Sequence, residues 1–521
     1  MKLKKIPFSD THAFNSFFLD YIQSAEKLKP FYHRFPNTEN FKAQIAEKSA
    51  SFSQEQRQIL VDALNQQYKH LTPPTRVSEN IAALKQANTF TVTTGHQLNI
   101  FTGPLYFVYK IVTVLNTCEQ LQKLYPEQRF VPVYWMASED HDYAEIKSIR
   151  LREKKYSWET AQQGAVGRFS TQGLSELAKS LPSDAKLFID AYAKNQTLAD
   201  AVRQYVTTLF GERGVVVIDA DDKALKSTFK EVIRQDVLQQ VNKPIVEKAT
   251  AALEALHYKT QIHCREINFF YLDKNLRSRL EEKDGQFQVV DTELTFTREA
   301  MEKLIDEHPE KFSPNVILRP LYQEMILPNL AYAGGPAEVI YWLQLKGTFE
   351  HFNTPFPILM PRNFGMVMDA VTYRKFEKTG LSLKDLFEEK NYLFNHWVLK
   401  NSERTVTVGE ERAIILDHYQ KLEARAATID KSLIMMMNAE TKRALNSLEK
   451  IERKFLRAEK RRHTDKLRQI EAVKDTLFPN GSLQERVDNI LNFYPENGSF
   501  IDTLIEFFDP FDFQFNVIVP D

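Results

Sequence analysis

Residues that could do chemistry gather first at Thr94-Gly95-His96-Gln97. Backbone N–H groups near a glycine form anion sites, and a helix beginning nearby would add the positive end of its dipole. The His96 and Gln97 side chains are able to hydrogen-bond phosphate oxygens as charge develops in a transition state. The segment is neither a P-loop nor a G-x-G-x-x-G fingerprint. It therefore predicts either a phosphate contact or an ordinary capped turn.

A second cluster, Ser138-Glu139-Asp140-His141-Asp142, has three carboxylates and one histidine within five residues. Alternate residues of an extended segment share a face, so Asp140 and Asp142 form one pair and Glu139 and His141 the other. Such pairs suit Mg²⁺ binding, a substrate amine or general-base catalysis. The alternative interpretation is a solvated strand end that caps the next element.

A third group surrounds Gly334-Gly335-Pro336, with Glu338 on the helix that the proline begins. Two glycines allow a ligand to approach the backbone closely. Upstream, Arg319 stands in an otherwise apolar stretch and suits bidentate contact with a carboxylate or phosphate. A structural ion pair between Arg319 and Glu324 explains the same residues equally well.

The elements that carry these residues are predicted from local patterns. Residues 89–94 read as a strand, and Gly95 permits a tight turn after it. Thr102-Gly103-Pro104 opens a helix with Thr102 or Gly103 as its cap, and 130–137 reads as a buried strand. A strand, a crossover helix and a strand form a βαβ unit, whose chemistry lies beyond the carboxyl ends of the strands.

Residues 329–360 repeat this order of strand, glycine turn, proline-started helix and strand, as TGPLYFVYK beside GGPAEVIYW shows. The repeat predicts two related half-sheets. In a doubly wound sheet the ligand crevice lies where such halves meet. We therefore expect 94–99 and 334–338 to face a shared crevice.

The C-terminal part is helical and charged, with no glycine or proline between Gly409 and Pro479. Heptad-like seams run through 415–436 and 437–458, offset by one residue. The offset predicts either a discontinuous coil or a hairpin near 430–438, with Asp430 capping a second helix of about 47 residues at 1.5 Å rise each. The seam predicts a homodimer, whereas a monomer would favour the hairpin.

Composition bounds the function classes. The chain has 521 residues, a net charge of −1 and two cysteines outside any C-x-x-C pair. These values argue against a global basic field for nucleic acid and exclude a cysteine zinc site. Neither a signal peptide nor an apolar run of membrane-spanning length is seen. We expect a cytoplasmic protein without nucleic-acid or membrane partners.

At this point longer motifs carry a resemblance. They are TGHQLNIFTGPLYFVYK, VPVYWMASEDHDYAEI, VGRF, INFFYLD, SPNVILRPLYQEMILPNLAYAGGPAEVIYWLQLK and FPNGSLQER. Together and in this order they resemble the BshC family, the cysteine ligases of bacillithiol biosynthesis. The resemblance implies an α/β fold: a Rossmann-like, nucleotidylyl transferase-like core with inserted segments, and a C-terminal helical coiled-coil domain that dimerises.

The resemblance also implies the organisation of the chain and its reaction. Residues 1–88 form an N-terminal helical segment, 89–375 the core with insertions at about 146–210 and 244–311, and 376–521 the coiled-coil region with a tail docked on the core. The implied reaction is the last pathway step, in which an ATP-dependent ligase joins cysteine to the amine of glucosaminyl malate. The resemblance implies ATP as the co-substrate and is compatible with Mg²⁺. It assigns no residues of this chain as metal ligands.

Roles follow for the motif residues. The expected catalytic residues are His96, Glu139, Asp140 and His141. The expected substrate-binding residues are Asp142, Arg319 and Glu338. The expected nucleotide-binding residues are Thr94, Gly95, Gln97, Gly103, Gly334 and Gly335.

One departure and two rival functions qualify these roles. The family turn often reads TGQQ where this chain has TGHQ. Hydrogen bonding to an anion is therefore a safer role for His96 than proton transfer. The rivals are a metal-dependent hydrolase that uses Asp140, His141 and Asp142, and a coiled-coil scaffold whose α/β part only binds ligands.

Overall fold

A five-stranded parallel sheet forms the centre of the computed structural model, which describes residues 1–521 except 152–153, 183 and 494–498. Its strand order is β13-β12-β2-β3-β6. The strands are β2 (Thr89–His96), β3 (Arg129–Met136), β6 (Val216–Asp219), β12 (Asn329–Gly334) and β13 (Ile358–Pro361). The chain winds outwards from β2 through β3 to β6, and from β12 to β13 in the opposite direction. The order therefore reverses between β2 and β12, which confirms the predicted Rossmann-like core.

The strands are buried on both faces, as parallel strands covered by helices must be. β2 carries threonines inside the sheet. Their hydroxyls are hydrogen-bonded to β12, across the point where the strand order reverses. The Thr91 and Thr93 hydroxyls donate to Asn329 Oδ1 at 3.0 and 2.8 Å, and the Thr94 hydroxyl donates to the Ala333 carbonyl at 2.7 Å. These bonds fix β2 against β12 where their registers shift between Asn329 and Ala331.

The connection from β2 to β3 differs locally from the prediction. Gly95 lies within β2 without a positive φ, so the chain does not turn there. The turn comes at Phe101, Thr102 and Gly103, whose φ angles are +52°, +67° and +64°. The helix α5 (Tyr106–Leu124) follows, and its N-cap is Leu105 rather than Thr102 or Gly103. Gly103 is part of this turn: its φ is positive, and a Cβ there would lie 2.6 Å from the Asn99 Cβ, so the position requires glycine.

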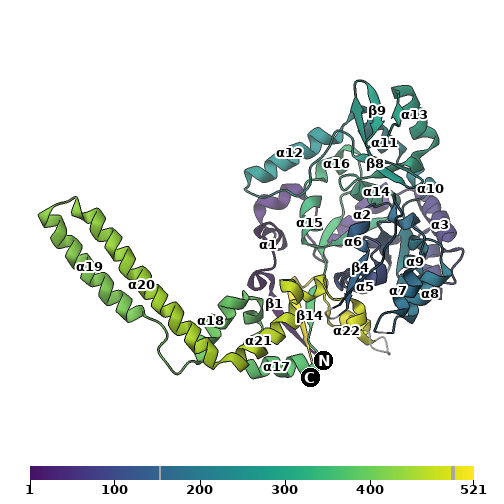
Figure 1. The fold of residues 1–521 in the computed structure, drawn as a ribbon. Coiled ribbons are helices and arrows are strands. Elements are labelled where there is room, and N and C mark those ends of the chain that lie inside the picture. Colours follow the sequence, from purple (N-terminus) through teal and green to yellow (C-terminus); the bar gives the residue numbers. More distant parts are fainter. Residues whose placement is uncertain (152–153, 183, 494–498) are drawn as a thin grey trace.

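Two insertions extend the sheet connections (Figure 1). Between β3 and β6 lie α6 (Tyr143–Ile146), β4 (Ser148–Leu151), β5 (Lys154–Ser157), α7 (Leu174–Lys179), α8 (Lys186–Lys194) and α9 (Leu198–Phe210). Between β6 and β12 lie α10 (Lys223–Ser227), α11 (Lys230–Gln239), α12 (Asn242–Ala255), α13 (Arg298–Glu307) and α14 (Arg319–Ile326). The Asp222 carboxylate caps α10 by accepting from the Leu225 N–H at 3.0 Å.

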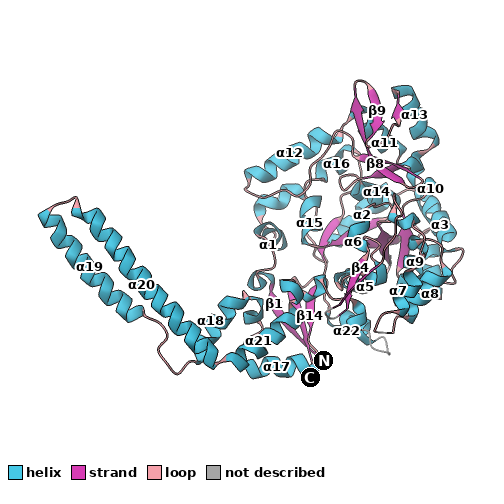
Figure 2. Cartoon of the chain, in the orientation of Figure 1, coloured by secondary structure: helices cyan, strands magenta, loops and turns pink. Residues whose placement is uncertain are grey.

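The second insertion also carries an antiparallel sheet of order β10-β9-β8-β7-β11. Its strands are β7 (Phe269–Asp273), β8 (Leu276–Lys283), β9 (Gln286–Val289), β10 (Thr295–Phe296) and β11 (Phe312–Pro314). After β12 come α15 (Pro336–Trp342) and α16 (Lys346–His351), which lead to β13. Figure 2 shows this small sheet apart from the central one.

The N-terminal helices are α1 (Ser16–Ile22), α2 (Asn40–Ser51), α3 (Gln54–Tyr68) and α4 (Thr75–Ala83). A capping box of Ser53 and Gln56 begins α3. A strand that the sequence did not indicate, β1 (Lys2–Pro7), pairs with β15 (Gln514–Val519), which pairs in turn with β14 (Phe364–Val367). The tail after Pro510 thus docks back, as expected.

A helical hairpin extends away from the core (Figure 1). It consists of α19 (Gly409–Ile429) and α20 (Leu433–Arg462), with the reversal at residues 430–432. This resolves the offset between the two seams in favour of a hairpin. Its base is formed with α17 (Ala370–Thr379), α18 (Lys390–Asn401) and α21 (Thr464–Leu477), and α22 (Ser499–Phe507) packs against α5. The helix after Asp430 is interrupted at His463 rather than continuous. None of the helices in the described part of the chain combines the length and apolar character needed to cross a bilayer.

Candidate functional site

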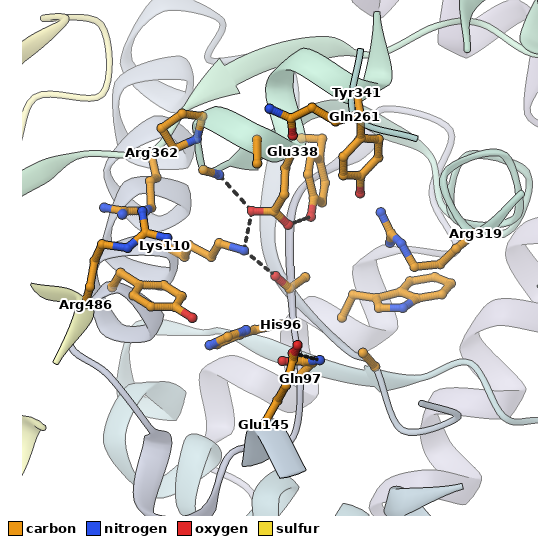
Figure 3. Close-up of a pocket in the computed structure, with 18 of the residues that line it drawn as sticks. His96, Gln97, Lys110, Glu145, Gln261, Arg319, Glu338, Tyr341, Arg362 and Arg486 are labelled. Carbon is orange, nitrogen blue, oxygen red and sulfur yellow. Dashed lines mark hydrogen bonds and ion pairs between the residues drawn. The ribbon is translucent and has the colours of Figure 1, made fainter. Parts of the chain in front are cut away.

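A cavity of about 510 Å³ opens at the carboxyl end of β2 and beside the β12–α15 turn, where the strand order reverses (Figure 3). This is the place where open α/β sheets bind ligands. The predicted segments 94–99 and 334–338 do meet here. The charged and polar side chains of the lining are Asn15, His96, Gln97, Tyr106, Lys110, Glu145, Gln261, Arg319, Tyr332, Glu338, Tyr341, Arg362 and Arg486.

Glu338 and Lys110 form the centre of the cavity wall. The Lys110 ammonium contacts Glu338 Oε2 at 2.6 Å and donates to the Gly95 carbonyl at 2.8 Å. The same carboxylate accepts from the Gly335 N–H at 2.7 Å and from the Tyr332 hydroxyl at 2.7 Å. The network therefore joins the end of β2, α5 and the start of α15. An ammonium has three N–H donors, and these contacts leave one for a ligand.

Electrostatics keep this pair ionised. Burial alone would raise the pKa of Glu338, but the Lys110 charge and hydrogen bonds lower it to about 2. Burial lowers the pKa of Lys110, and the Glu338 charge opposes that shift. With only 4% of its side chain exposed, Lys110 places a desolvated positive charge at the cavity wall. Charges in such surroundings act more strongly than charges in water.

Arg319 lies at another side of the cavity, in a cage of aromatic rings. Its guanidinium carbon is 5.7 Å from the Trp135 ring centre, 5.4 Å from that of Tyr332 and 5.9 Å from that of Trp342. Arg319 Nη1 donates to Gln323 Oε1 at 3.1 Å, so Glu324 is not its partner. Glu324 pairs instead with Lys48, at 3.2 Å. The structure therefore contradicts the alternative in which Arg319 pairs with Glu324. The Arg319 guanidinium is available to bind an anion.

Gly95 lies at the cavity wall between Tyr332 and Arg319. A Cβ at this position would lie 3.4 Å from the Tyr332 hydroxyl and 3.7 Å from Arg319 Nη1, which is ordinary van der Waals contact. Gly95 is therefore part of the strand end rather than of a turn, and the lack of a side chain leaves its backbone open to the cavity. The Gly335 N–H donates to the Glu338 carboxylate at 2.7 Å.

Arg362 and Arg486 line the cavity beside Tyr106. The Arg362 guanidinium lies 5.3 Å from the Tyr106 ring centre and donates to Glu485 Oε1 at 2.6 Å. Arg486 is exposed and comes from the C-terminal region. Figure 3 shows these two arginines and Lys110 on one side of the cavity, and Arg319 and Tyr341 on the other. The cavity therefore has two separate positively charged sides.

His96 lines the cavity next to the Tyr106 and Phe107 rings, with ring-centre distances of 5.1 and 5.4 Å. Burial, reinforced by the charges of Lys110 and Arg362, lowers its pKa to about 3. The imidazole is therefore neutral at physiological pH. It suits hydrogen bonding to a ligand and makes a poor general base near pH 7.

We expect His96→Gln to retain kcat/KM within about tenfold, because a neutral amide supplies similar hydrogen bonds, and His96→Ala to lose more. The wild-type pH–rate profile between pH 5 and 9 should be unchanged in His96→Gln. Because the folded-state pKa is lowered, stability linked to neutral His96 is complete above about pH 6.5 and is lost as the pH falls toward 3. Urea unfolding should therefore show wild type losing stability relative to His96→Gln below pH 6. A pH–rate limb that disappears in His96→Gln would contradict this interpretation.

The 138–142 cluster lies behind the cavity rather than in its lining. The Ser138 hydroxyl bonds to Asp219, and Glu139 forms a buried ion pair with Lys226 of α10. Burial raises the pKa of Glu139 despite that partner. These contacts fasten the end of β3 to the end of β6 and to α10, which is a structural role.

Asp140 is the member of this cluster nearest to the cavity, since Gln97 Nε2 donates to Asp140 Oδ2 at 3.2 Å. Gln97 also donates to Glu145 Oε2 at 2.6 Å, and Glu145 lines the cavity. His141 Nδ1 lies 2.6 Å from Arg277 Nη1, and Asp142 is exposed at the start of α6. Among the residues that the structure describes, no three His, Cys, Asp or Glu side chains gather as a metal site would require. The geometry therefore gives the hydrolase alternative no support.

Three of the predicted nucleotide-binding positions do not line this cavity. Thr94 and Gly334 are buried in β2 and β12, where they support the lining residues next to them. Gly103 belongs to a smaller cavity of about 250 Å³ near Arg150 and Lys155. Gly95, Gln97 and Gly335 are in the lining of the main cavity.

Sequence reasoning missed Lys110, Glu145, Arg362 and Arg486. Lys110 interrupts the apolar run YFVYKIVTVL, and a charge in a helix buried all round is a signal of a partnered or functional group. Arg362 directly follows the buried strand β13, which is the same kind of position as the end of β2. Arg486 ends the motif FPNGSLQER, but it lies over one hundred residues beyond β13, and nothing local indicated that it reaches the sheet.

Comparisons with known proteins agree with this architecture. Residues 1–363 match the family model described as bacillithiol biosynthesis BshC, N-terminal Rossmann-like domain, and residues 365–520 match the BshC C-terminal coiled-coil domain. A relative from Flavobacterium psychrophilum is 41% identical over 95% of this chain and 94% of its own. Relatives from Christiangramia forsetii and Flavobacterium johnsoniae are each 39% identical over 98% of this chain, covering 98% and 99% of theirs. All three carry the name "Putative cysteine ligase BshC".

Among solved structures, a chain titled as an arginyl-tRNA synthetase from Campylobacter jejuni aligns over 83% of this chain and 98% of its own at 10% identity. Its TM-score of 0.22 is too low to support an argument about fold or function.

Proposed function

The chain belongs to the BshC family of bacillithiol biosynthesis, and we propose that it is an ATP-dependent ligase that joins cysteine to the amine of glucosaminyl malate. This would be the last step of the pathway. The observation that carries the proposal is a single cavity at the switch point with two separate positively charged sides. One side suits the carboxylate of an amino acid and the other suits phosphate groups.

Arg319 is the proposed anchor for the cysteine carboxylate. A guanidinium matches a carboxylate bidentately, and its aromatic cage limits competition from water. The rings of Trp135 and Tyr341 line the same side, where the thiol would make sulfur–aromatic contacts. Gln261 comes from the second insertion and closes this side.

The nucleotide phosphates are proposed to meet Gly95, Gly335, Lys110 and His96. Backbone at the two glycines allows close approach, and the Lys110 ammonium offers an N–H donor. Mg²⁺ would be held by the phosphates of the nucleotide itself.

The chemistry follows from the need to activate a carboxylate before it forms an amide in water. A carboxylate oxygen of cysteine attacks either the α- or the γ-phosphorus of ATP, and pyrophosphate or ADP leaves. The amine nitrogen of glucosaminyl malate then attacks the acyl carbon. A C–N bond forms, the acyl C–O bond breaks, and AMP or phosphate leaves with the electron pair. The nitrogen gives up one proton to a carboxylate.

Glu145 is the carboxylate proposed to accept the proton from the amine. Asp140 lies behind it, outside the cavity lining. Glu145 lines the cavity, and Gln97 holds both carboxylates at 2.6 and 3.2 Å. Glu139 is committed to Lys226, so we assign it to positioning rather than to proton transfer.

The test combines turnover with a selective variant. Purified protein given cysteine, glucosaminyl malate and ATP should release bacillithiol with stoichiometric AMP or ADP, measured by chromatography. Arg319→Lys should raise the KM for cysteine about tenfold and Arg319→Gln about a hundredfold, with the KM for ATP within about threefold of wild type. No amide product together with no nucleotide cleavage would refute the function. Equal effects on both KM values would refute the role of Arg319.

A homodimer through the hairpin is also proposed, because α19 and α20 expose apolar side chains after packing on each other. Those more than a third exposed are Ile414, Leu416, Leu422, Ile429, Met435, Met436, Ile451 and Phe455. Light scattering should give the mass of two chains. Ile451→Lys with Phe455→Lys should give one chain, whereas Gln420→Lys, on an exposed polar position of α19, should remain dimeric. A wild-type mass of one chain would contradict the dimer.

A further inference from the structure

The C-terminal region reaches into the cavity of the core through one short segment, Gln484–Arg486. Arg486 lines the main cavity, and it also lines two neighbouring cavities, one at the base of the hairpin and one near Gly103. The segment lies beyond the hairpin in the chain. Its contribution to the cavity is therefore unrelated to the βαβ elements that position the other lining residues.

This segment is fastened to the core by buried polar contacts. Glu485 is fully buried, accepts from Arg362 Nη2 at 2.6 Å and accepts from the Gly365 N–H at 2.9 Å. Gln484 Oε1 accepts from the Val367 N–H at 2.8 Å, and its amide donates to the Val367 carbonyl at 3.1 Å. Residues 484–485 thus act as an extra partner for β14. The position of Arg486 is fixed by these bonds.

The same contacts orient Arg362. Its Nη2 is held by Glu485 and its Nη1 donates to the Asn363 carbonyl at 2.8 Å. Its Nε is buried and has no hydrogen-bond partner in the described part of the chain. The Arg362 guanidinium lies 5.3 Å from the Tyr106 ring centre, and Figure 3 shows Arg486 on the same side of the cavity.

The charge balance on this side of the cavity is positive because the Arg486 charge has no ion-pair partner there. Glu338 offsets the charge of Lys110, and the buried Glu485 offsets that of Arg362 from behind the lining. The Arg486 side chain has neither an ion pair nor a hydrogen bond to another described residue, whereas its backbone N–H donates to the Leu483 carbonyl at 2.9 Å. The guanidinium groups of Arg362 and Arg486 and the Lys110 ammonium present N–H donors to one ligand group, which suits an anion with several oxygens.

We propose that Arg362 and Arg486 form a two-arginine subsite for a multiply charged anion, half of which the C-terminal region supplies. This deepens the proposed function, in which two substrates carry such a group: the triphosphate of ATP and the dicarboxylate of the malate unit. Glu485 is the positioning residue of the subsite, because it holds Arg362 and the backbone next to Arg486.

The test uses the full chain and simple anions, so that binding is measured without catalysis. Calorimetry compares inorganic tripolyphosphate and L-malate on wild type, Arg486→Gln and Arg468→Gln. Arg468 is a matched control, because it is an arginine of the C-terminal region with 74% of its side chain exposed. We expect Arg486→Gln to raise the dissociation constant of one of the two anions at least tenfold. Arg468→Gln should change neither dissociation constant by more than about twofold. The anion whose binding is weakened identifies the substrate whose charged group occupies the subsite.

Three outcomes would overturn the subsite. They are a wild type that binds neither anion, equal affinities for wild type and Arg486→Gln, and an equal loss in Arg468→Gln that would indicate a general charge effect. Arg486→Gln is at an exposed position, so loss of folding does not confound the result. Anion binding that depends on Arg486 in a protein without amide-forming activity would refute the proposed function and leave the subsite standing.

Discussion

Lys110→Met is expected to lower kcat about 10²–10³-fold, equivalent to roughly 2.7–4 kcal/mol, which is the usual loss when one preorganised donor for developing charge is removed. The buried ammonium of wild type lines the cavity, and its contacts with Glu338 and the Gly95 carbonyl leave one N–H without a partner among the described residues. Methionine has a similar length and no charge. Lys123→Met, an exposed position on the same helix, should leave kcat unchanged.

A second variant separates catalysis from folding. Lys110→Met alone leaves the Glu338 carboxylate without its cation, which is expected to destabilise the fold. Lys110→Met with Glu338→Gln removes that charge, so urea unfolding should recover part of the lost stability. Turnover should stay low, because the donor is still absent. If the double variant regains wild-type turnover, or the single variant never loses it, Lys110 has only a structural role.

Lys48→Met is expected to lower the free energy of unfolding by about 3–5 kcal/mol, the usual cost of removing one partner from a buried ion pair. The Lys48 ammonium lies 3.2 Å from Glu324 Oε2, with 1% and 0% of the two side chains exposed. The pair joins α2 to α14, and Glu324 also accepts from Asn329 at 2.6 Å and from Gln323 at 2.9 Å. The loss therefore extends to the strand switch point. Urea unfolding measures it directly.

The pH dependence of this loss has a defined sign. Burial raises the pKa of Glu324 even with Lys48 present, and removing the lysine raises it further. A raised folded-state pKa means that stability is complete at low pH and is lost as the pH rises. Lys48→Met should therefore approach wild-type stability as the pH falls toward 4. Lys42→Met, exposed on the same helix, is the control, and a loss from it equal to that of Lys48→Met would contradict the ion-pair explanation.

Local patterns predicted the central part of the fold well. The strands at 89–94 and 130–137, the helix between them and the repeated order at 329–360 are all present. The reversal of strand order placed 94–99 and 334–338 at one cavity, as the repeat indicated. These features depend on periodicity and on short-range connections, which a sequence displays directly.

Contacts between distant residues account for what the sequence did not show. Lys110 meets Glu338 and Arg362 meets Glu485 only because the sheet and the C-terminal region bring them together. Gly95 was interpreted as a turn glycine, whereas it lies inside β2 and lines the cavity next to Tyr332 and Arg319. In the 138–142 cluster, whose acids were expected to be catalytic or substrate-binding, Glu139 is used in an ion pair with Lys226, whereas Asp140 accepts from Gln97 beside the cavity. The roles expected for this cluster stay predictions. Whether a carboxylate faces a cavity or a lysine depends on tertiary packing.

The contacts by which residues 484–486 hold the C-terminal region on the core have a consequence for how the sequence of this protein can evolve. The two family models divide the chain between residues 363 and 365. Yet Arg362 pairs with Glu485 across that division, and β1 near the start of the chain pairs with β15 near its end, also across it. A recombination event that exchanged one part alone would mismatch a buried charge and a strand partner at once. The two parts are therefore expected to be inherited together, with substitutions at 362 and 485 tolerated only in concert.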